Sequence, residues 1–220
     1  TREPIDPVRF MSNYSSGKMG YEVAIAAKTM GATVKLISGP VSLDPVKGVE
    51  TQYVETSNEM YEAVMSNIKD FDILISTAAI ADYKPANYSK TKYKKNQNNI
   101  SIEFKRGIDI ITTVSNKYKN IYTVGFAAET DSLKKNSLDK LTKKNLNMIV
   151  GNIANHELKL GFESDYNEVT IFTKNKSLKI ALSKKSEIAK SVLSAIADDY
   201  TSNIKLINKH AKWNKNNINR

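Results

Sequence analysis

Small polar residues stand directly before a stretch of helical apolar spacing in the segment Ser12–Gly20, which reads SNYSSGKMG. From Met19 to Met30 apolar residues recur at helical spacing, which predicts an amphipathic helix that ends near Gly31. Ser15 or Ser16 can cap its first turn, and Gly17 lets other groups approach the backbone. Because a helix start presents unpaired N–H groups and a partial positive charge, Ser15, Ser16 and Gly17 predict a phosphate-binding site. An ordinary capped helix without a ligand has the same pattern.

Two common phosphate motifs are absent from this segment. A Walker A loop requires Gly in place of Ser12 and Ser or Thr in place of Met19. Only the final Gly17-x-x-Gly20 of the dinucleotide fingerprint G-x-G-x-x-G is present. An NAD(P)-binding Rossmann-type oxidoreductase is therefore the weaker alternative for this chain. A nucleotide that binds here must be held by contacts other than those of these two motifs.

Strand-like and helix-like segments alternate along the chain. This order predicts a doubly wound, Rossmann-like α/β fold, with a mostly parallel sheet and helices on both faces, hence three layers. The expected strands cover residues 32–37, 49–54, 71–76, 100–104, 121–126, 146–150 and 169–173, and the expected helices residues 16–31, 57–68, 109–117, 132–144 and 186–200. Residues 1–10 are expected as a loop, because prolines interrupt them. The predicted domain covers residues 1–204, followed by a polar tail, 205–220, that we expect to fray.

In such a sheet ligands bind beyond the carboxyl ends of the strands, where three runs of small residues occur. The first follows the strand that ends at Ser76 and contains Thr77, Ala78 and Asp82, whose carboxylate could contact a ribose hydroxyl or a metal. The second run is 125–130 around Phe126, and the third is 151–155. Tight strand-to-helix turns also need small residues, but three such turns at one sheet edge favour a ligand site.

Lysines lie near both parts of the predicted site. The loop 90–99 contains Lys92, and it could close over a phosphorylated substrate and neutralise its charge. Lys140 and Lys144 share one helix face, so they repel each other by roughly a few tenths of a kcal/mol. An anion between them would turn this repulsion into attraction. From the spacing alone, a solvated lysine-rich surface is the simpler interpretation of that helix.

Composition narrows the function classes. The chain has 220 residues, a formal net charge of +10 and no Cys, which excludes a disulfide framework and a thiolate metal site. The lack of Cys fits a reducing, cytoplasmic environment, and no apolar run approaches the roughly 20 residues of a membrane span. The positive charge is scattered and comes mainly from Lys, which disfavours nucleic acid as a partner and fits small phosphorylated anions. Neither His156 nor His210 has the spacing of a metal ligand or a triad, so no metal-binding residue is assigned.

Seven motifs in one order resemble the phosphopantothenate–cysteine ligase family. The likeness is to the carboxyl-terminal ligase domain of bacterial bifunctional enzymes of coenzyme A biosynthesis, and it extends over most of the chain. It rests on TREPIDPVRF (1–10), SNYSSGKMG (12–20), SGPV (38–41), AAIADY (78–83), KYKK (92–95), GFAAET (125–130) and GFESDYN (161–167). Together these motifs are far more specific than any one of them.

The resemblance implies a reaction in two halves. The carboxylate of phosphopantothenate attacks the α-phosphate of CTP and releases pyrophosphate, and the amine of cysteine then displaces CMP from the acyl-cytidylate to form an amide. Mg²⁺ is expected with the triphosphate. The family is dimeric, so we expect a homodimer in which each lysine loop completes the neighbour's site. An upstream flavin-dependent decarboxylase domain is also expected, because the sequence starts with Thr1 rather than Met.

The resemblance also assigns roles by position. Asn13 would bind the acyl-cytidylate, Arg9 would support the same site, and Lys92 would contact CTP and assist amide formation, so these three are the predicted catalytic residues. The predicted CTP-binding residues are Ser76, Thr77, Ala78, Asp82, Lys92, Gly107, Ile108, Asp109, Ile110, Phe126, Lys140 and Lys144.

Two features depart from the family pattern. The strand and Gly pair that the family usually has before Thr1 are absent from this sequence, so we expect a gap or a raw edge in the sheet. The segment Arg106–Ile110 stands where the family has Asn-Pro-Asp.

Overall fold

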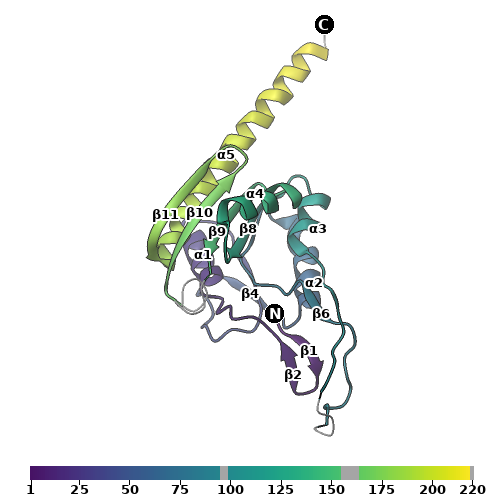
Figure 1. Ribbon diagram of the computed structural model, residues 1–220. Coiled ribbons are helices and arrows are strands. Elements are labelled where there is room, and N and C mark those ends of the chain that lie inside the picture. The colour runs from purple at the N-terminus through teal and green to yellow at the C-terminus, as the bar shows by residue number, and fades with distance from the viewer. Residues whose placement is uncertain (95–98, 155–163, 219–220) are drawn as a thin grey trace.

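A mixed five-stranded sheet forms the centre of the molecule (Figure 1). The computed structural model describes residues 1–94, 99–154 and 164–218, with side chains of the last helix described as far as residue 202. The strand order is β11 (Ser177–Lys184), β10 (Tyr166–Thr173), β9 (Met148–Ile153), β8 (Tyr122–Glu129) and β5 (Ile73–Ser76). β5, β8 and β9 run parallel, whereas β10 is antiparallel to both β9 and β11. The predicted α/β fold is confirmed, with a larger antiparallel part than expected.

Strand β11 is absent from the prediction because it lies at the sheet edge. Most of its side chains are exposed, and lysines stand among its apolar residues. Lysine on an edge strand hinders pairing with other chains, but it also weakens the apolar signal from which a strand is predicted.

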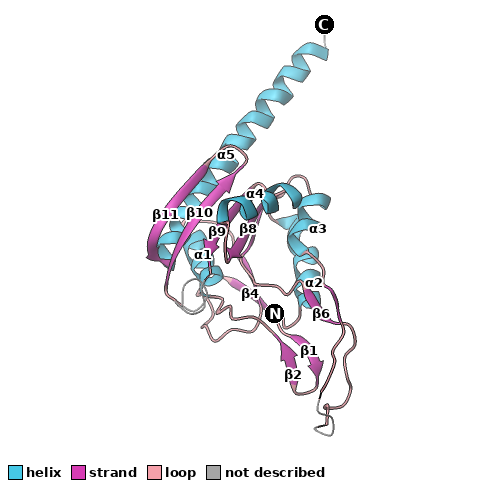
Figure 2. Cartoon of the chain, viewed as in Figure 1, coloured by secondary structure: helices cyan, strands magenta, loops and turns pink. Residues whose placement is uncertain are grey.

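Helices cover both faces of the sheet and give the three expected layers (Figure 2). α1 (Lys18–Thr29) and α5 (Lys185–Ile218) pack on one face, in a core cluster that includes Val23, Val150 and Val192. α4 (Leu133–Lys143) covers the opposite face, where Leu141 and Ile149 belong to a second cluster. α2 (Ser57–Asn67) and α3 (Ile110–Lys117) share a third cluster beside it, and a short 3-10 turn, Ile68–Asp70, links α2 to β5.

The sheet is interrupted between β3 and β5. β3 (Lys35–Ser38) and β4 (Glu50–Tyr53) form a separate parallel pair, without a ladder to the five-stranded sheet in the described chain. β5 is therefore an edge strand, and its residues, which read ILIS, are only half-buried. In a doubly wound sheet the strand that precedes the first helix lies between these two strands. The break therefore matches the gap expected from the sequence.

Two pairs of short antiparallel strands extend the molecule beyond the sheet. β1 (Glu3–Asp6) pairs with β2 (Arg9–Met11), and β6 (Tyr83–Pro85) pairs with β7 (Phe104–Arg106), both antiparallel. The expectation of a loop over residues 1–10 was wrong, because prolines suit an edge strand and a turn as well as a loop. The strand expected over 100–104 was also wrong, since pairing begins only at Phe104. We call β1, β2, β6, β7 and the loop residues 86–94 the arm.

α5 runs far beyond the sheet (Figure 1). The predicted helix 186–200 is confirmed, but residues 205–218 are helical as well, which corrects the expected frayed tail. The Tyr122 hydroxyl on β8 donates a hydrogen bond of 2.6 Å to Asp199 and so ties this helix to the sheet. Within the described part of the chain, no helix combines the length and apolarity that a bilayer span requires.

Candidate functional site

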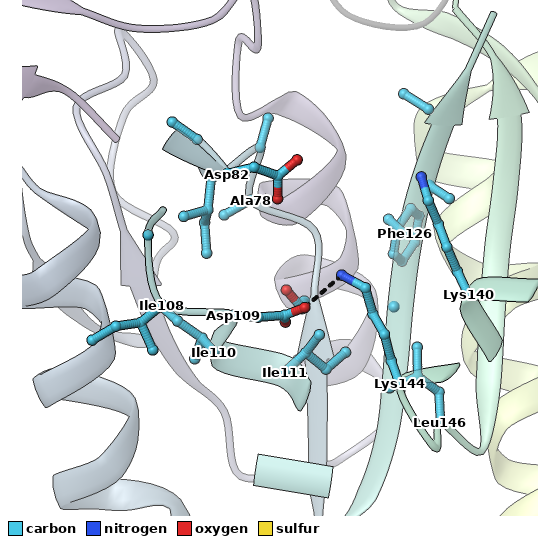
Figure 3. Close-up of a pocket in the computed structure, with 18 of the residues that line it drawn as sticks. Ala78, Asp82, Ile108, Asp109, Ile110, Ile111, Phe126, Lys140, Lys144 and Leu146 are labelled. Carbon is cyan, nitrogen blue, oxygen red and sulfur yellow. Dashed lines mark ion pairs between the residues drawn. The ribbon is translucent and has the colours of Figure 1, made fainter. Parts of the chain in front are cut away.

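A pocket of about 240 Å³ lies where β5 and β8 end, on the side expected for a ligand (Figure 3). Its walls come from the loop after β5, the segment before α3, the second half of β8, and two lysines, Lys140 in α4 and Lys144 at the C-cap of that helix. The predicted CTP-binding residues that line it are Ser76, Ala78, Asp82, Gly107, Ile108, Asp109, Ile110, Phe126, Lys140 and Lys144. The structure thus brings together residues from four separate segments.

Close backbone packing shapes the wall formed by Ala78–Asp82 and Gly107. The Ile80 N–H donates to the Ala78 carbonyl over 3.1 Å, and the Gly107 N–H donates to the Asp82 carbonyl over 2.7 Å. A Cβ on Gly107 would lie 3.0 Å from the Ala81 carbonyl oxygen. The small residues in both segments therefore allow two backbone loops to meet and leave the Asp82 side chain exposed beside the pocket.

Asp109 connects α3 to α4 at the floor of the pocket. One carboxylate oxygen accepts a hydrogen bond of 3.1 Å from the Thr112 N–H and caps α3, and the other lies 2.9 Å from Lys144 Nζ (Figure 3). Burial raises the pKa of Asp109, but the hydrogen bonds from Lys144 and Thr112 outweigh it and hold this pKa below its ordinary value. Asp109 is therefore ionised at neutral pH and pairs with a lysine predicted to bind CTP.

Lys140 has a different carboxylate partner, Glu129, which the prediction of site residues omitted. Lys140 Nζ lies 2.6 Å from one oxygen of Glu129, and the Asn136 amide donates to the other over 3.3 Å. The Glu129 side chain is only 10% exposed. Eleven positions separate the two charged residues, a spacing that carries no helical or strand signal, so only the packing of α4 on β8 reveals the pair.

The start of α1 lies outside the residues that line this pocket. Its N-cap is Gly17 in a left-handed conformation with φ of 76°, so the expectation that Ser15 or Ser16 occupies the cap was wrong. Glycine is favoured there because other residues are strained at positive φ. Thr77, predicted to contact CTP, does not line the pocket either; its hydroxyl packs against Gly20 in the first turn of α1.

Asn13 touches the pocket wall, whereas Arg9 and Lys92 lie elsewhere. The Asn13 amide donates to the carbonyl of Ala79, a residue that lines the pocket. Arg9 instead links parts of the arm: its guanidinium group forms an ion pair of 2.9 Å with Asp6 and donates a hydrogen bond of 2.8 Å to the Tyr93 carbonyl. Lys92 is exposed on the adjoining loop. The structure therefore separates two of the three predicted catalytic residues from the pocket of their own chain.

The predicted turns after Val124 and Val150 are also corrected. β8 continues to Glu129 and β9 to Ile153, so both runs lie in strands that extend further than the apolar pattern indicated. The run around Phe126 lines the pocket, but Gly151 packs against Leu133 of α4 and does not. The motif residues Lys95, Gly161 and Phe162, together with Asn155 and His156, lie outside the described residues, as do the side chains of His210 and Trp213.

No group of three His, Cys, Asp or Glu side chains suited to hold a metal occurs among the described residues. The carboxylate nearest to such a role is Asp82, which lines the pocket without an ion pair in the described chain. A metal that enters with a phosphorylated ligand needs only one or two protein carboxylates, because the phosphates supply the remaining oxygens.

Comparisons with known proteins show to which family the chain is related. Residues 1–200 match the family described as "DNA/pantothenate metabolism flavoprotein C-terminal domain". The coenzyme A biosynthesis bifunctional protein CoaBC of Vibrio parahaemolyticus is 44% identical over 196 residues, which cover 88% of this chain and 49% of the relative. CoaBC of Bacillus subtilis is 44% identical over 199 residues, covering 90% of this chain and 49% of the relative. The chain therefore spans about half the length of these curated relatives.

Two solved structures have the same fold as this chain. The crystal structure of the C-terminal domain of CoaBC has a TM-score of 0.76 and 39% identity and covers 89% of each chain. A Cab2 mutant in complex with phosphopantothenate-cysteine has a TM-score of 0.75 at 14% identity, over 93% of this chain and 86% of that one, a likeness of fold alone. The family match over residues 1–200 and the identity to CoaBC lead to one conclusion: the chain belongs to the DNA/pantothenate metabolism flavoprotein C-terminal domain family.

Proposed function

We propose that the chain catalyses the CTP-dependent ligation of phosphopantothenate to cysteine, a step of coenzyme A biosynthesis. The observation that carries this proposal is the pocket in which Phe126 and the small Ala78 face two lysines, Lys140 and Lys144. An aromatic ring and exposed backbone suit a base, and paired ammonium groups suit phosphates. The names of the CoaBC relatives support a role in coenzyme A biosynthesis.

The reaction requires activation of a carboxylate, which is a poor electrophile at neutral pH. The phosphopantothenate carboxylate attacks the α-phosphorus of CTP, the bond to the β-phosphate oxygen breaks, and pyrophosphate leaves. The cysteine amine then attacks the acyl carbon, loses a proton and expels CMP. Both substrates are anions, so the site must offset their repulsion with cations and N–H dipoles. Lys140 and Lys144 line the pocket, and their ammonium groups would offset this repulsion.

Mg²⁺ fits the donors that the pocket offers. Asp82 would hold the ion together with phosphate oxygens, since its carboxylate lines the pocket without an ion pair in the described residues. When bound, Mg²⁺ neutralises charge on the triphosphate and makes pyrophosphate a better leaving group. Asn13 lies on the adjoining wall through its hydrogen bond to Ala79, where it can orient the acyl group.

The proposal is tested by product analysis. Pyrophosphate release should require both CTP and phosphopantothenate, and CMP and the amide should appear only after cysteine is added.

Among CTP, ATP, GTP and UTP with Mg²⁺, CTP should raise the melting temperature of the protein most. Lys144→Met should weaken CTP binding, while Lys143→Met on the exposed side of the same helix, where that lysine side chain is 78% exposed, should not. Pyrophosphate release that persists without phosphopantothenate would contradict the ligase assignment, and NADPH binding in place of CTP would favour the oxidoreductase.

We also propose that two copies share their sites. Arg9 and Lys92 lie on the arm and do not line the pocket of their own chain, and the arm exposes apolar side chains, Val8 by 59% and Phe10 by 49%. A second copy would bury this apolar surface and receive both cations. Mixing a Lys92→Gln variant with a Lys144→Met variant should then restore activity, because one site in the mixed dimer is intact. The absence of restoration in a mixture shown to exchange subunits would contradict shared sites.

The length of the relatives extends the proposal to a longer protein. Because this chain spans about half of the bifunctional CoaBC proteins, we propose that a flavin-dependent decarboxylase accompanies it, which would consume the product of the ligation.

A further inference from the structure

Two lysines that line the same pocket are each paired with a carboxylate, and the two carboxylates differ in how far they depend on their lysine. Asp109 pairs with Lys144 over 2.9 Å, and Glu129 pairs with Lys140 over 2.6 Å. Lys140 of α4 and Lys144 at its C-cap both line the pocket, so a triphosphate that enters must compete with both carboxylates. Which lysine changes partner depends on the support that each carboxylate keeps when its lysine leaves.

The Asp109 carboxylate would remain stabilised by other groups if Lys144 moved away. Its side chain is 36% exposed, so water can replace Lys144. It also remains the N-cap of α3, with the Thr112 N–H as donor, and the positive end of that helix stabilises its charge. Release of Lys144 therefore costs little.

Glu129 would keep almost no stabilising contact if Lys140 moved away. Its side chain is 10% exposed, and the neutral Asn136 amide at 3.3 Å is the other donor that the described structure provides to it. Glu129 ends a strand and, unlike Asp109, is not the N-cap of a helix, since the N-cap of α4 is Ser132. Removal of Lys140 would leave a buried carboxylate without a cation, which is strongly unfavourable.

We propose that Asp109 is an internal substitute for a phosphate, which gives up Lys144 when the nucleotide binds, whereas Glu129 is a positioning residue that holds Lys140 in place throughout. This inference rests on the proposed nucleotide site. Lys140 donates one N–H to Glu129 and directs the remaining ones toward the ligand. Lys144, which pairs with Asp109 in the structure (Figure 3), would move from that carboxylate to a phosphate when the nucleotide binds.

The two roles predict opposite effects from removal of a negative charge. Asp109→Asn removes the competitor of the phosphates but keeps a good N-cap residue, so CTP with Mg²⁺ should bind about two- to fivefold more tightly. Glu129→Met removes the carboxylate that orients Lys140, so binding should weaken by roughly tenfold. If only the net charge of the pocket mattered, both variants would bind the nucleotide more tightly. If both substitutions simply disturbed the structure of the pocket, both would bind it more weakly.

Isothermal titration with CTP and Mg²⁺, and separately with inorganic triphosphate, measures these affinities. Asp139→Asn is the matched control, because it removes a carboxylate that pairs with Lys143 over 3.5 Å on the exposed side of α4, and it should leave affinity unchanged. If Glu129 acts through Lys140, the double variant Glu129→Met/Lys140→Met should bind no more weakly than Lys140→Met alone. Melting temperatures without ligand verify that each variant is folded.

The outcomes separate the two levels of the proposal. Wild-type protein that binds neither CTP nor triphosphate overturns the nucleotide site and this inference with it. Wild-type binding combined with a weaker Asp109→Asn variant, or with additive losses in the double variant, overturns only the inference. Should Glu129→Met not fold, the sign of the Asp109→Asn effect still decides whether Asp109 competes for Lys144.

Discussion

The contact between Gly20 and Thr77 joins the first turn of α1 to the loop that enters the pocket. A Cβ on residue 20 would lie 2.6 Å from the Thr77 hydroxyl oxygen and 3.7 Å from its Cβ. Only the hydroxyl is too close, since 3.7 Å is ordinary van der Waals contact. Thr77 is β-branched, so rotation about its χ1 brings its methyl group toward the same space. Gly20→Ala therefore forces the helix and the loop apart.

The magnitude follows from two opposing effects. Alanine in place of glycine stabilises a helix by about 0.5–1 kcal/mol, and overpacking destabilises by about 1–3 kcal/mol. Gly20→Ala should thus lower the free energy of unfolding by up to about 2.5 kcal/mol, and the melting temperature by roughly 2–4 °C for each kcal/mol. In a Thr77→Ala background the clash is absent, and the same substitution should stabilise by up to about 1 kcal/mol.

Urea unfolding of the wild type, both single variants and the double variant measures this change of sign. The expected coupling is about 1–3 kcal/mol. If Gly20→Ala destabilises equally in both backgrounds, the cost lies elsewhere in the helix start, and the reasoning from this contact is refuted. If Gly20→Ala stabilises the protein in both backgrounds, the loop around Thr77 moves away without a loss of free energy and Gly20 is not required for packing.

Further predictions concern the arm, α5 and the second half-reaction. Asp6→Asn should speed proteolysis of the loop around Tyr93, because the buried carboxylate accepts hydrogen bonds from Arg9 and the Tyr93 N–H. Burial raises the pKa of Asp6, but these donors and the Val8 N–H outweigh it, so this pKa lies below its ordinary value. In the wild type, protection of the loop against proteolysis should therefore persist above about pH 4 and disappear as the pH falls through the lowered pKa of the folded state. In the variant this protection should be absent at every pH. Tyr122→Phe should destabilise by about 1–3 kcal/mol in urea unfolding, since Asp199 loses its 2.6 Å donor, and an unchanged midpoint would mean that water replaces it. In rapid-quench experiments Lys92→Gln should slow amide formation more than pyrophosphate release, and equal slowing of both would remove its assigned role.

Local patterns in the chain anticipated much of the fold and the segments of the pocket. Parallel strands such as the half-buried Ile73–Ser76 carry an apolar run, and helices such as α3 begin at a recognisable cap, Asp109, so local patterns locate both. Edge elements were missed, because the exposed β11 and the proline-containing β1 lack a buried face to impose alternation.

The sequence by itself determined which residue types are available to a ligand: small residues after β5 and on β8, an aromatic ring at Phe126, and lysines one helical turn apart. Only the tertiary structure decided their partners, because an ion pair depends on where α4 lies against β8 and α3 and not on spacing along the chain. Glu129 and Asp109 each take one lysine for that reason. The same packing turned Thr77 toward Gly20 and left Arg9 and Lys92 on the arm, since burial and contact geometry are properties of the folded chain.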